Sequence, residues 1–417
     1  ERKQEVATVS ARMELLRKLV LRPASGGPKG RKMVLLVMDG IGGLPDRSGR
    51  TELEAAQKPN LGKLASRSDL GMLEIVDVGI TPGSGPGHLS LFGYDPLEYG
   101  IGRGILEALG VGAVLGPGDV CARGNFCTRD LAGIIVDRRA GRIPTEESGR
   151  IVDRLSAAIT EIDGVRVSFR AGLEHRFVVI FSGEGLSERV TDADPQKEGL
   201  PVKWAEASAP GGERTAEIAN SFIRRVSEVL RSESKANACL LRGFSSAPDI
   251  PTLGELYGIS PVAIATYPMY KGLSRLVGMD IADAGKTLDE LFDTVGAVWD
   301  DHDFFYIHVK YTDSRGEDGN FEAKRRVVEQ VDSLLPKVTA LNPDVLAITG
   351  DHSTPSVMAG HSWHSVPVLL SSPYTRFGMS STFGERSCVL GSLGKIPGPS
   401  LMGLMLAHAG RLAKYGA

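Results

Sequence analysis

Val34-Leu-Leu-Val-Met-Asp39 is a short apolar run that stops at a carboxylate, and two more stretches of this chain follow the same pattern. They are Phe304-Phe-Tyr-Ile-His-Val-Lys-Tyr-Thr-Asp313 and Val345-Leu-Ala-Ile-Thr-Gly-Asp351-His352. Each apolar run predicts a buried β-strand. In open α/β sheets, ligands bind at the carboxyl ends of the strands, so acids placed there can converge in space. The sequence therefore predicts an α/β fold in which these acids share one edge of a sheet.

The 417 residues are too many for one ordinary domain. Alternating strand-like and helix-like segments are interrupted between about residues 116 and 274 by short β-rich runs and two helical patterns. We therefore expect a discontinuous core of residues 31–115 and 275–417, with helices on both faces of its sheet, and an inserted α+β domain of residues 116–274. Residues 1–30 are expected to form an N-terminal helix and a linker. The cleft between the domains is the expected place for a small-molecule site.

Composition excludes several classes of partner. The chain has 48 Lys and Arg against 51 Asp and Glu, and this net charge of -3 offers no general attraction to nucleic acid or an anionic membrane. Four cysteines without CxxC spacing indicate reduced thiols instead of a zinc ribbon. No apolar run reaches the ~18 residues of a membrane span, and residues 1–21 lack the apolar core of a signal peptide. We expect a cytoplasmic protein.

The candidate nucleophile is Ser84, in Thr81-Pro-Gly-Ser84-Gly-Pro-Gly-His88. The glycines of this expected loop allow backbone conformations that other residues resist. A serine hydroxyl is a weak nucleophile at neutral pH and needs a base or a metal beside it. Because many carboxylates are available, we expect metal coordination to activate Ser84 for phosphoryl transfer. The alternative is a serine in an ordinary Gly/Pro-rich turn.

The candidate metal ligands are hard carboxylate oxygens together with two imidazoles, a set that suits divalent ions. They are Asp39, Asp313, Glu317, Asp351, His352 and His361. The alternatives are a helix cap for Asp39, a solvated acidic loop for Asp313 and Glu317, and a surface-loop histidine for His361. The adjacent Asp351-His352 pair is the hardest to explain structurally, because it forms a tight polar turn that directs two ligands at one ion.

A second constellation is basic. Its members are Arg138, Arg139 and Arg142, followed by Arg176, Arg242 and Lys271. The planar guanidinium matches carboxylate and phosphate, so these residues suit a small, multiply charged anion; the alternative is a solvated surface. Neither a Walker A motif nor a dinucleotide fingerprint is present, so nucleotide binding is unsupported. His308 and His408 are interpreted as structural.

Several strings resemble those of the cofactor-independent phosphoglycerate mutases of the archaeal type, which belong to the alkaline phosphatase superfamily. The strings include Val37-Met-Asp39-Gly-Ile-Gly-Gly, Thr81-Pro-Gly-Ser84-Gly-Pro-Gly-His88, Ala122-Arg-Gly-Asn125-Phe, Val136-Asp-Arg-Arg-Ala-Gly-Arg-Ile, Tyr267-Pro-Met-Tyr-Lys271-Gly-Leu and Thr349-Gly-Asp351-His352-Ser-Thr-Pro. The resemblance covers most of the chain, from about residue 33 to residue 410.

The resemblance implies two divalent ions, Mn²⁺ or Mg²⁺ with Zn²⁺ as an alternative. One ion would be held by Asp39, Ser84, Asp351 and His352, and the other by Asp313, Glu317 and His361. Ser84 would take the phosphoryl group as phosphoserine while the inserted domain holds glycerate, so that 2-phosphoglycerate and 3-phosphoglycerate interconvert without bisphosphoglycerate. The implied substrate-binding residues are His88, Asn125, Asp137, Arg138, Arg139, Arg176 and Lys271.

The chain departs from the family pattern at Glu317, where the family usually carries histidine. A carboxylate adds negative charge and a hard ligand, which favours Mn²⁺ or Mg²⁺ over Zn²⁺. Other functions stay open at this point: a phosphatase or another phosphomutase of the same superfamily, a homoserine kinase-like enzyme, which needs a nucleotide, and a metal-binding regulatory protein without activity.

Overall fold

The computed structural model of the chain describes residues 11–22, 31–376, 378 and 380–416. It divides into two compact units, the first made of Glu1–Gly100 and Ile250–Ala417 and the second of Ile101–Asp249. These limits differ from the expected ones, and the boundaries are corrected for two reasons. Residues 103–110 form a helix that packs on strands of the second unit, and residues 261–264 form a strand of the first unit's sheet.

An eight-stranded sheet forms the centre of the first unit, in the order β10-β9-β11-β1-β12-β13-β2-β14. Its strands are β1 (Met33–Met38), β2 (Asp69–Glu74), β9 (Pro261–Ile264), β10 (Asp280–Ile281), β11 (Phe304–Val309), β12 (Val345–Thr349), β13 (Val366–Ser371) and β14 (Gly394–Pro397). The strands from β10 to β12 are parallel, whereas β13 is antiparallel to both of its neighbours. Every residue of β1, β11 and β12 is buried, as expected for strands covered on both faces.

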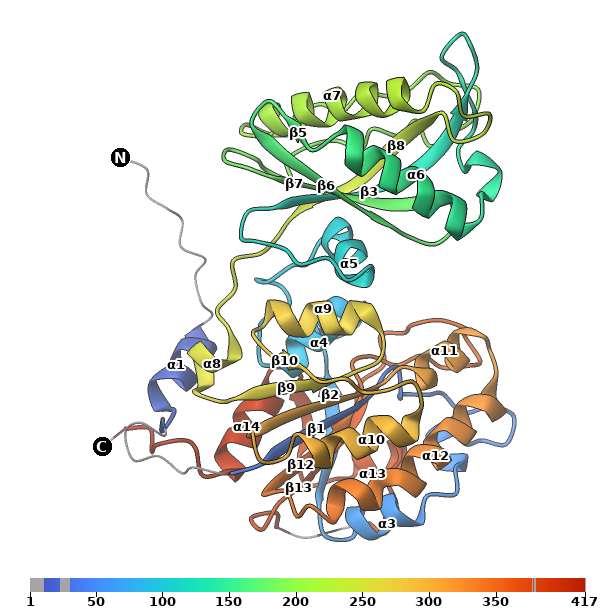
Figure 1. Cartoon of the computed structure of the whole chain (residues 1–417). Coiled ribbons are helices and arrows are strands. Elements are labelled where there is room, and N and C mark those ends of the chain that lie inside the picture. Colours follow the sequence, from blue (N-terminus) through green and yellow to red (C-terminus); the bar gives the residue numbers. More distant parts are fainter. Residues whose placement is uncertain (1–10, 23–30, 377, 379, 417) are drawn as a thin grey trace. The chain divides into compact units, whose positions relative to one another are not determined.

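Helices cover the two faces of this sheet (Figure 1). They are α1 (Ala11–Leu19), α2 (Glu52–Ala55), α3 (Pro59–Ala65), α4 (Ser84–Leu91), α8 (Leu253–Tyr257), α9 (Pro268–Leu276), α10 (Leu288–Ala297), α11 (Tyr311–Glu317), α12 (Phe321–Thr339), α13 (Glu385–Val389) and α14 (Ser400–His408). α2, α8 and α10 each begin with a capping box, in which a threonine and a glutamate three residues later satisfy each other's backbone N–H groups. The α/β fold expected from the sequence is confirmed.

The second unit is an antiparallel sheet with helices packed on it. Its strands are β3 (Val120–Arg129), β4 (Ile135–Asp137), β5 (Glu161–Ile162), β6 (Val165–Ala171), β7 (Arg176–Ser182) and β8 (Ala238–Ser246), and its helices are α5 (Arg103–Gly110), α6 (Thr145–Ala158) and α7 (Glu213–Val229). Figure 1 shows α6 and α7 on the same face of the sheet. The core between these helices and the sheet is aromatic: Phe222 contacts both Phe169 and Phe181.

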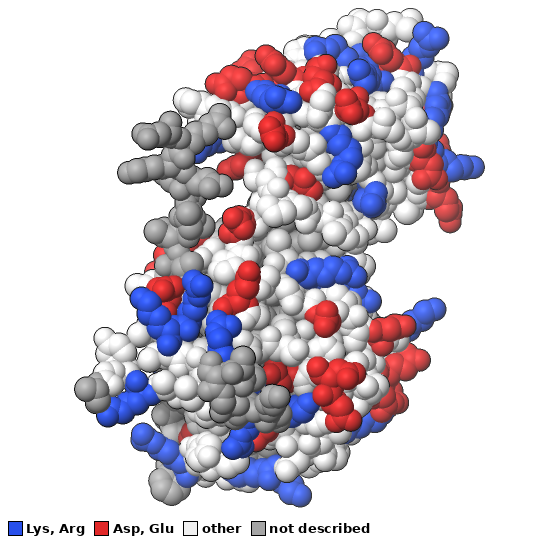
Figure 2. Space-filling view, turned by 60° about the vertical axis from the view of Figure 1, so that its left-hand side comes forward, with Lys and Arg blue, Asp and Glu red and all other residues white. Residues whose placement is uncertain are grey.

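The N-terminal helix expected for residues 1–21 is present as α1, while residues 1–10 and the expected linker at 23–30 lie outside the described residues. In the part of the chain that the structure describes, no helix is both long enough and apolar enough to cross a membrane. Figure 2 shows that basic and acidic side chains are interspersed on each unit in the face in view, in keeping with the small net charge.

Candidate active site

The residues predicted to bind metal in the first unit come together at the carboxyl edge of its sheet. Asp39 directly follows β1, and Asp351 and His352 follow β12, the neighbouring strand. His361 lies in the segment before β13, which runs antiparallel to β12 and therefore starts at the edge where β12 ends. Side chains from both ends of the chain are thereby brought to one place.

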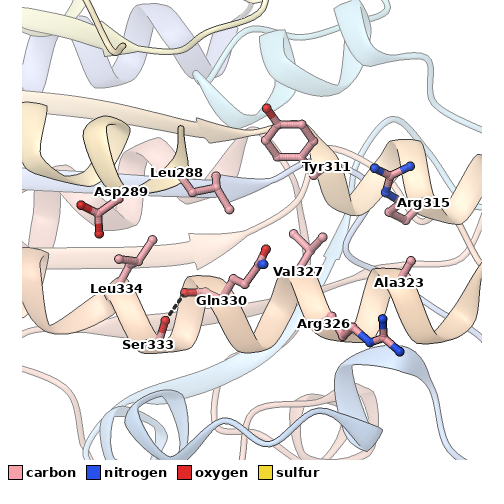
Figure 3. A pocket seen from close by; sticks show the side chains of 10 residues that line it. All are labelled: Leu288, Asp289, Tyr311, Arg315, Ala323, Arg326, Val327, Gln330, Ser333 and Leu334. Carbon is pink, nitrogen blue, oxygen red and sulfur yellow. Dashed lines mark hydrogen bonds between the residues drawn. The ribbon is translucent and has the colours of Figure 1, made fainter. Parts of the chain in front are cut away.

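Asp313 reaches this edge by a route that differs from the prediction. The strand ends at Val309, and residues 311–317 form α11 instead of an extended run and a loop. Because residues four apart share one face of a helix, Asp313 and Glu317 lie on one side of α11. Tyr311 and Arg315 lie on the other side, where they line a groove of about 500 Å³ together with residues of α10 and α12 (Figure 3).

Asp39, Asp351 and His352 form what we call the inner cluster. Nε2 of His352 lies 3.3 Å from Oδ1 of Asp39 and 3.2 Å from Oδ2 of Asp351, and all three side chains are fully buried. Neither of these two carboxylate oxygens has a hydrogen-bond partner among the described residues. Buried charged oxygens without partners are costly. Their convergence on an imidazole nitrogen therefore fits a divalent cation.

The hydroxyl of Thr354 determines which nitrogen of His352 carries the proton. Oγ1 of Thr354 lies 2.6 Å from Oδ1 of Asp313 and 2.9 Å from Nδ1 of His352. Burial would raise the pKa of Asp313, but the hydrogen bond from His361 and the charge of Lys310 outweigh it and lower the pKa. The ionised carboxylate can only accept, so Thr354 donates to Asp313 and accepts from Nδ1–H of His352. The lone pair of His352 is therefore on Nε2, which faces the inner cluster.

Ser84 lies beside the inner cluster, with its Oγ 3.5 Å from Nε2 of His352. The sequence predicts a loop here, whereas α4 begins at Ser84 itself. The N-cap residue Gly83 has no side chain to occupy the N–H groups of the first turn, which face an anion favourably. Gly87 is needed for close packing, because a Cβ there would lie 2.4 Å from the backbone oxygen of Asp351. The start of α4 thus presents a hydroxyl and backbone donors together.

Asp313, Glu317 and His361 form what we call the outer cluster. Nε2 of His361 lies 3.5 Å from Oδ1 of Asp313 and 3.8 Å from Oε1 of Glu317. Nδ1 of His361 is 3.0 Å from the backbone oxygen of Pro82 and donates to it. The charged imidazole therefore bonds Asp313 through Nε2–H. Burial would lower the pKa of His361, but this bond outweighs burial and raises the pKa to about 9, and removal of that proton leaves a lone pair facing the two acids. The side chain of Glu317 is 53% exposed and that of His361 is 23% exposed. The outer cluster is therefore more open than the inner one, and Glu317 is its most peripheral member.

Besides Thr354, three further residues that were not predicted from the sequence contact the site: Tyr270, His308 and Lys310. His308, interpreted from the sequence as structural, lies with its Nε2 2.8 Å from Oδ2 of Asp39. Nζ of Lys310 lies 2.5 Å from Oδ2 of Asp313 and 3.2 Å from the hydroxyl of Tyr270. Burial would lower the pKa of Lys310, but the charges of Asp39 and Asp313 outweigh burial and raise the pKa.

Two of these three residues, Lys310 and His308, could have been predicted from the sequence. Lys310 directly follows β11, just as Asp39 follows β1, so the same strand-end argument applies to it. His308 lies two residues earlier, on the same side of the strand. Tyr270 lies on α9, and its position next to the site follows only from the packing of that helix.

His88, predicted to bind substrate, is fully buried on α4. Its Nδ1 lies 2.9 Å from the backbone oxygen of Ser84 and 3.2 Å from Oδ2 of Asp351. The side chain therefore faces the inner cluster. Direct contact with substrate stays a prediction for this residue.

The other predicted substrate-binding residues divide between the two units. Lys271 lies on α9 in the first unit. Asn125, Asp137, Arg138, Arg139 and Arg176 lie in the second unit. Asn125 pairs in register with Arg176 on the neighbouring strand, and its Oδ1 has no hydrogen-bond partner among the described residues. Arg138 is already held by Asp194, with its Nη2 2.6 Å from Oδ2, and Asp137 accepts hydrogen bonds from the backbone of residues 139 and 141.

Further arginines gather around Arg176. Burial lowers the pKa of His175, and the positive charges of Arg176, Arg139 and Arg123 lower it further, so each of these arginines lies within electrostatic reach of His175. Arg123 also pairs in register with Arg242 across β3 and β8. Arg123 is not predicted from the sequence, because a single arginine inside a β-rich run has no distinguishing pattern.

Comparison with known proteins agrees with this architecture. The family model for 2,3-bisphosphoglycerate-independent phosphoglycerate mutase matches residues 65–235. A protein of Thermosipho africanus named a probable 2,3-bisphosphoglycerate-independent phosphoglycerate mutase is 54% identical over 390 residues, which cover 94% of this chain and 97% of that protein. One of Thermus thermophilus with the same name is 53% identical over 390 residues, covering 93% and 96%.

Among solved structures, the cofactor-independent phosphoglycerate mutase from Thermoplasma acidophilum is similar to this chain with a TM-score of 0.75. The two share 29% sequence identity over 91% of this chain and 100% of that one. The relatives match nearly the whole length of the chain. The chain therefore belongs to the family of 2,3-bisphosphoglycerate-independent phosphoglycerate mutases.

Proposed function

We propose that this protein interconverts 2-phosphoglycerate and 3-phosphoglycerate through a phosphoserine on Ser84. The observation that carries the proposal is the position of the Ser84 hydroxyl, 3.5 Å from Nε2 of His352, where the inner cluster meets the start of α4. A serine placed there has both a site for an activating cation and backbone donors for phosphoryl oxygens. The names of the relatives support the same reaction.

The reaction consists of two half-reactions at the same hydroxyl. Oγ of Ser84 attacks the phosphorus of the substrate, the Oγ–P bond forms as the P–O bond to glycerate breaks, and the serine proton ends on the glycerate oxygen. The other hydroxyl of glycerate then attacks the phosphoserine, the Oγ–P bond breaks, and Ser84 recovers a proton. The two halves balance, so neither bisphosphoglycerate nor a nucleotide is consumed.

We propose two cation sites built from the two clusters. Asp39, Ser84, Asp351 and His352 would hold one cation, and Asp313, Glu317 and His361 the other. Divalent cations, when bound, lower the pKa of a coordinated hydroxyl and neutralise the charge of a transferring phosphoryl group. The carboxylate of Glu317 favours Mn²⁺ or Mg²⁺ over Zn²⁺, because hard oxygen ligands select hard cations.

The substrate-binding groups belong to the same proposal. Asn125, together with Arg123, Arg139 and Arg176 around His175, offers an amide and three guanidinium groups, which suit the carboxylate and hydroxyls of glycerate. Lys271 and His88 stay predictions for phosphate or substrate contact. The cytoplasmic location expected from cysteine usage also stays a prediction.

A coupled assay tests the function. The protein is stripped of metal with a chelator, reloaded with Mn²⁺ and given 3-phosphoglycerate together with enolase in the absence of bisphosphoglycerate. Formation of phosphoenolpyruvate is the expected result, and acid quenching followed by mass spectrometry should find phosphate on Ser84. The metal-stripped protein is the control and should form no product.

The same assay separates the competing functions. Release of inorganic phosphate without phosphoenolpyruvate would replace the mutase with a phosphatase. Phosphorylation of homoserine at the expense of ATP would support the kinase-like alternative, and binding of Mn²⁺ without turnover of any of these substrates would indicate a regulatory protein.

A further inference from the structure

Two carboxylates that belong to different clusters turn one oxygen each toward the same lysine. Asp39 directs Oδ1 into the inner cluster, and its Oδ2 lies 3.5 Å from Nζ of Lys310. Asp313 directs Oδ1 toward His361 in the outer cluster, and its Oδ2 lies 2.5 Å from the same Nζ. The ammonium group therefore lies behind both acids and leaves their ligand oxygens facing the cation positions.

The surroundings of Lys310 hold it in this place. Its side chain is only 19% exposed. The ammonium group has three N–H donors and three acceptors near them. Two acceptors are the carboxylate oxygens of Asp39 and Asp313, and the third is the hydroxyl of Tyr270, 3.2 Å from Nζ. Tyr270 is itself buried and stacks on His308 with ring centroids 3.7 Å apart, and His308 hydrogen-bonds to Oδ2 of Asp39. An amine fixed by three partners is a rigid spacer between the two acids.

We propose that Lys310 is a positioning residue that couples the two cation sites, because it fixes Asp39 and Asp313 in the orientation in which each gives one oxygen to its own cation. The inference rests on the two-cation site of the proposed function and adds to it the residue that links the two halves. Without the ammonium group, the two outward oxygens repel each other, and this repulsion is opposed by neutral partners such as His308 on Asp39 and Thr354 on Asp313. Partners that orient metal ligands contribute strongly to affinity. A single residue behind both acids therefore affects both sites.

The experiment compares Mn²⁺ binding by calorimetry in chelator-stripped wild type, Lys310→Met and Lys32→Met. The methionine keeps the length of the lysine stem and removes the charge. Lys32 is a matched control, since it is also partly buried and hydrogen-bonded but precedes β1, at the opposite end of the strand from Asp39. We expect two bound Mn²⁺ in wild type and Lys32→Met, and dissociation constants at least about tenfold higher at both sites in Lys310→Met.

Two further variants distinguish coupling from a general loss of structure. His361→Ala, which removes a ligand of the outer cluster and none of the inner cluster, should lose one Mn²⁺ and keep the other. Electron paramagnetic resonance of the loaded proteins gives a spectroscopic readout, because a neighbouring Mn²⁺ pair is spin-coupled and an isolated ion is not. Lys310→Met should lose the coupled signal at Mn²⁺ concentrations that saturate the wild type.

Several results of these binding experiments would contradict the proposed role of Lys310. Two Mn²⁺ bound with wild-type affinity by Lys310→Met, or weakening at one site alone, would overturn it while the proposed function stands. If Lys310→Met does not fold, Tyr270→Phe takes its place: it removes one acceptor of Nζ, and unchanged affinity at both sites would overturn the inference. No Mn²⁺ binding by the wild type would remove the two-cation site itself, and the inference with it.

Discussion

The inner and outer clusters are neighbours that the chain builds in opposite ways. The inner cluster comes from residues directly after two adjacent parallel strands, β1 and β12, and its three side chains are fully buried. The outer cluster comes from a short helix, α11, and from the segment before β13, and Glu317 is 53% exposed. One set of ligands is therefore fixed by the sheet, and the other lies where helix packing and solvent reach it.

This difference indicates a division of tasks. Residues held by central strands cannot move without disturbing the core, so the inner cluster suits the step that needs exact placement of Ser84. The outer cluster can change a ligand at the surface without disturbing the sheet, and the family-atypical Glu317 lies there. We therefore expect changes in the inner cluster to remove function and changes in the outer cluster to alter its metal dependence.

The largest effect is expected for Ser84→Ala beside the inner cluster. The variant lacks the only atom that can carry the phosphoryl group in the proposed reaction, so mutase activity should fall by at least ~10⁴-fold. Mn²⁺ should still raise the melting temperature, since Asp39, Asp351 and His352 remain. The coupled assay and a thermal melt check both statements. Retained mutase activity would show that Ser84 is not the nucleophile.

The next largest effect is expected in the stabilisation of the folded state by Mn²⁺, when one ligand of each cluster is replaced in turn. At a Mn²⁺ concentration of 100 times the dissociation constant, binding to one site stabilises the folded state by about 2.7 kcal/mol. Asp39→Asn should lose most of the stabilisation that Mn²⁺ provides, because the charge of a buried ligand is removed. Glu317→Gln should keep at least the stabilisation that comes from Mn²⁺ bound at the inner cluster. Thermal melts with Mn²⁺ and with chelator measure the difference, and equal losses would abolish the distinction between the clusters.

The sequence predicts the inner cluster better than its surroundings, for a physical reason. Asp39 stands directly after an apolar run and Asp351 one glycine after another, and a strand end is a local pattern that places a side chain at a known edge of the sheet. The sequence predicts Asp313 at the end of a longer strand, but Gly316 did not prevent helix α11, which packs on α12. Tyr270 reaches the site only through tertiary packing of α9, and no local pattern encodes that contact.

The domain boundaries illustrate the same limit. The expected inserted domain began near residue 116 because the change of texture there is visible in the sequence. α5 nevertheless belongs to the second unit, since Ile105 donates its N–H to the hydroxyl of Ser245, 140 residues later. β9 belongs to the first sheet because it pairs with β11. Both assignments depend on contacts between distant segments, which composition and periodicity do not report.

A smaller effect is expected for Glu317→His in the outer cluster. The imidazole restores the ligand usual in the family, and a softer ligand with less negative charge favours Zn²⁺ relative to Mn²⁺. The ratio of Zn²⁺-supported to Mn²⁺-supported activity should rise several-fold, while the Michaelis constant for 3-phosphoglycerate changes little. Activity measured against each metal checks the prediction. Metal profiles that superimpose for the two proteins would refute it.

The smallest effect concerns the support behind the inner cluster. Glu385 accepts a hydrogen bond from the backbone N–H of Gly43, at 2.9 Å, and another from the hydroxyl of Thr51, and it thereby holds the segment that follows Asp39. Burial is the main cause that raises the pKa of Glu385 to about 7, and the nearby charge of Glu54 adds to it.

Because the pKa is higher in the folded state, the folded protein keeps a proton that the unfolded chain has already lost above pH ~4.5. The contribution of Glu385 to stability therefore falls as the pH rises from about 4.5 to about 7. Glu385→Gln cannot ionise and still accepts from Gly43, so its melting temperature should depend less on pH across this range, by a few degrees. Glu184→Gln, at an exposed loop position, is the control and should follow the wild type. Parallel curves for wild type and Glu385→Gln would show that this carboxyl does not titrate in the range, and that the inner cluster rests on a support insensitive to pH.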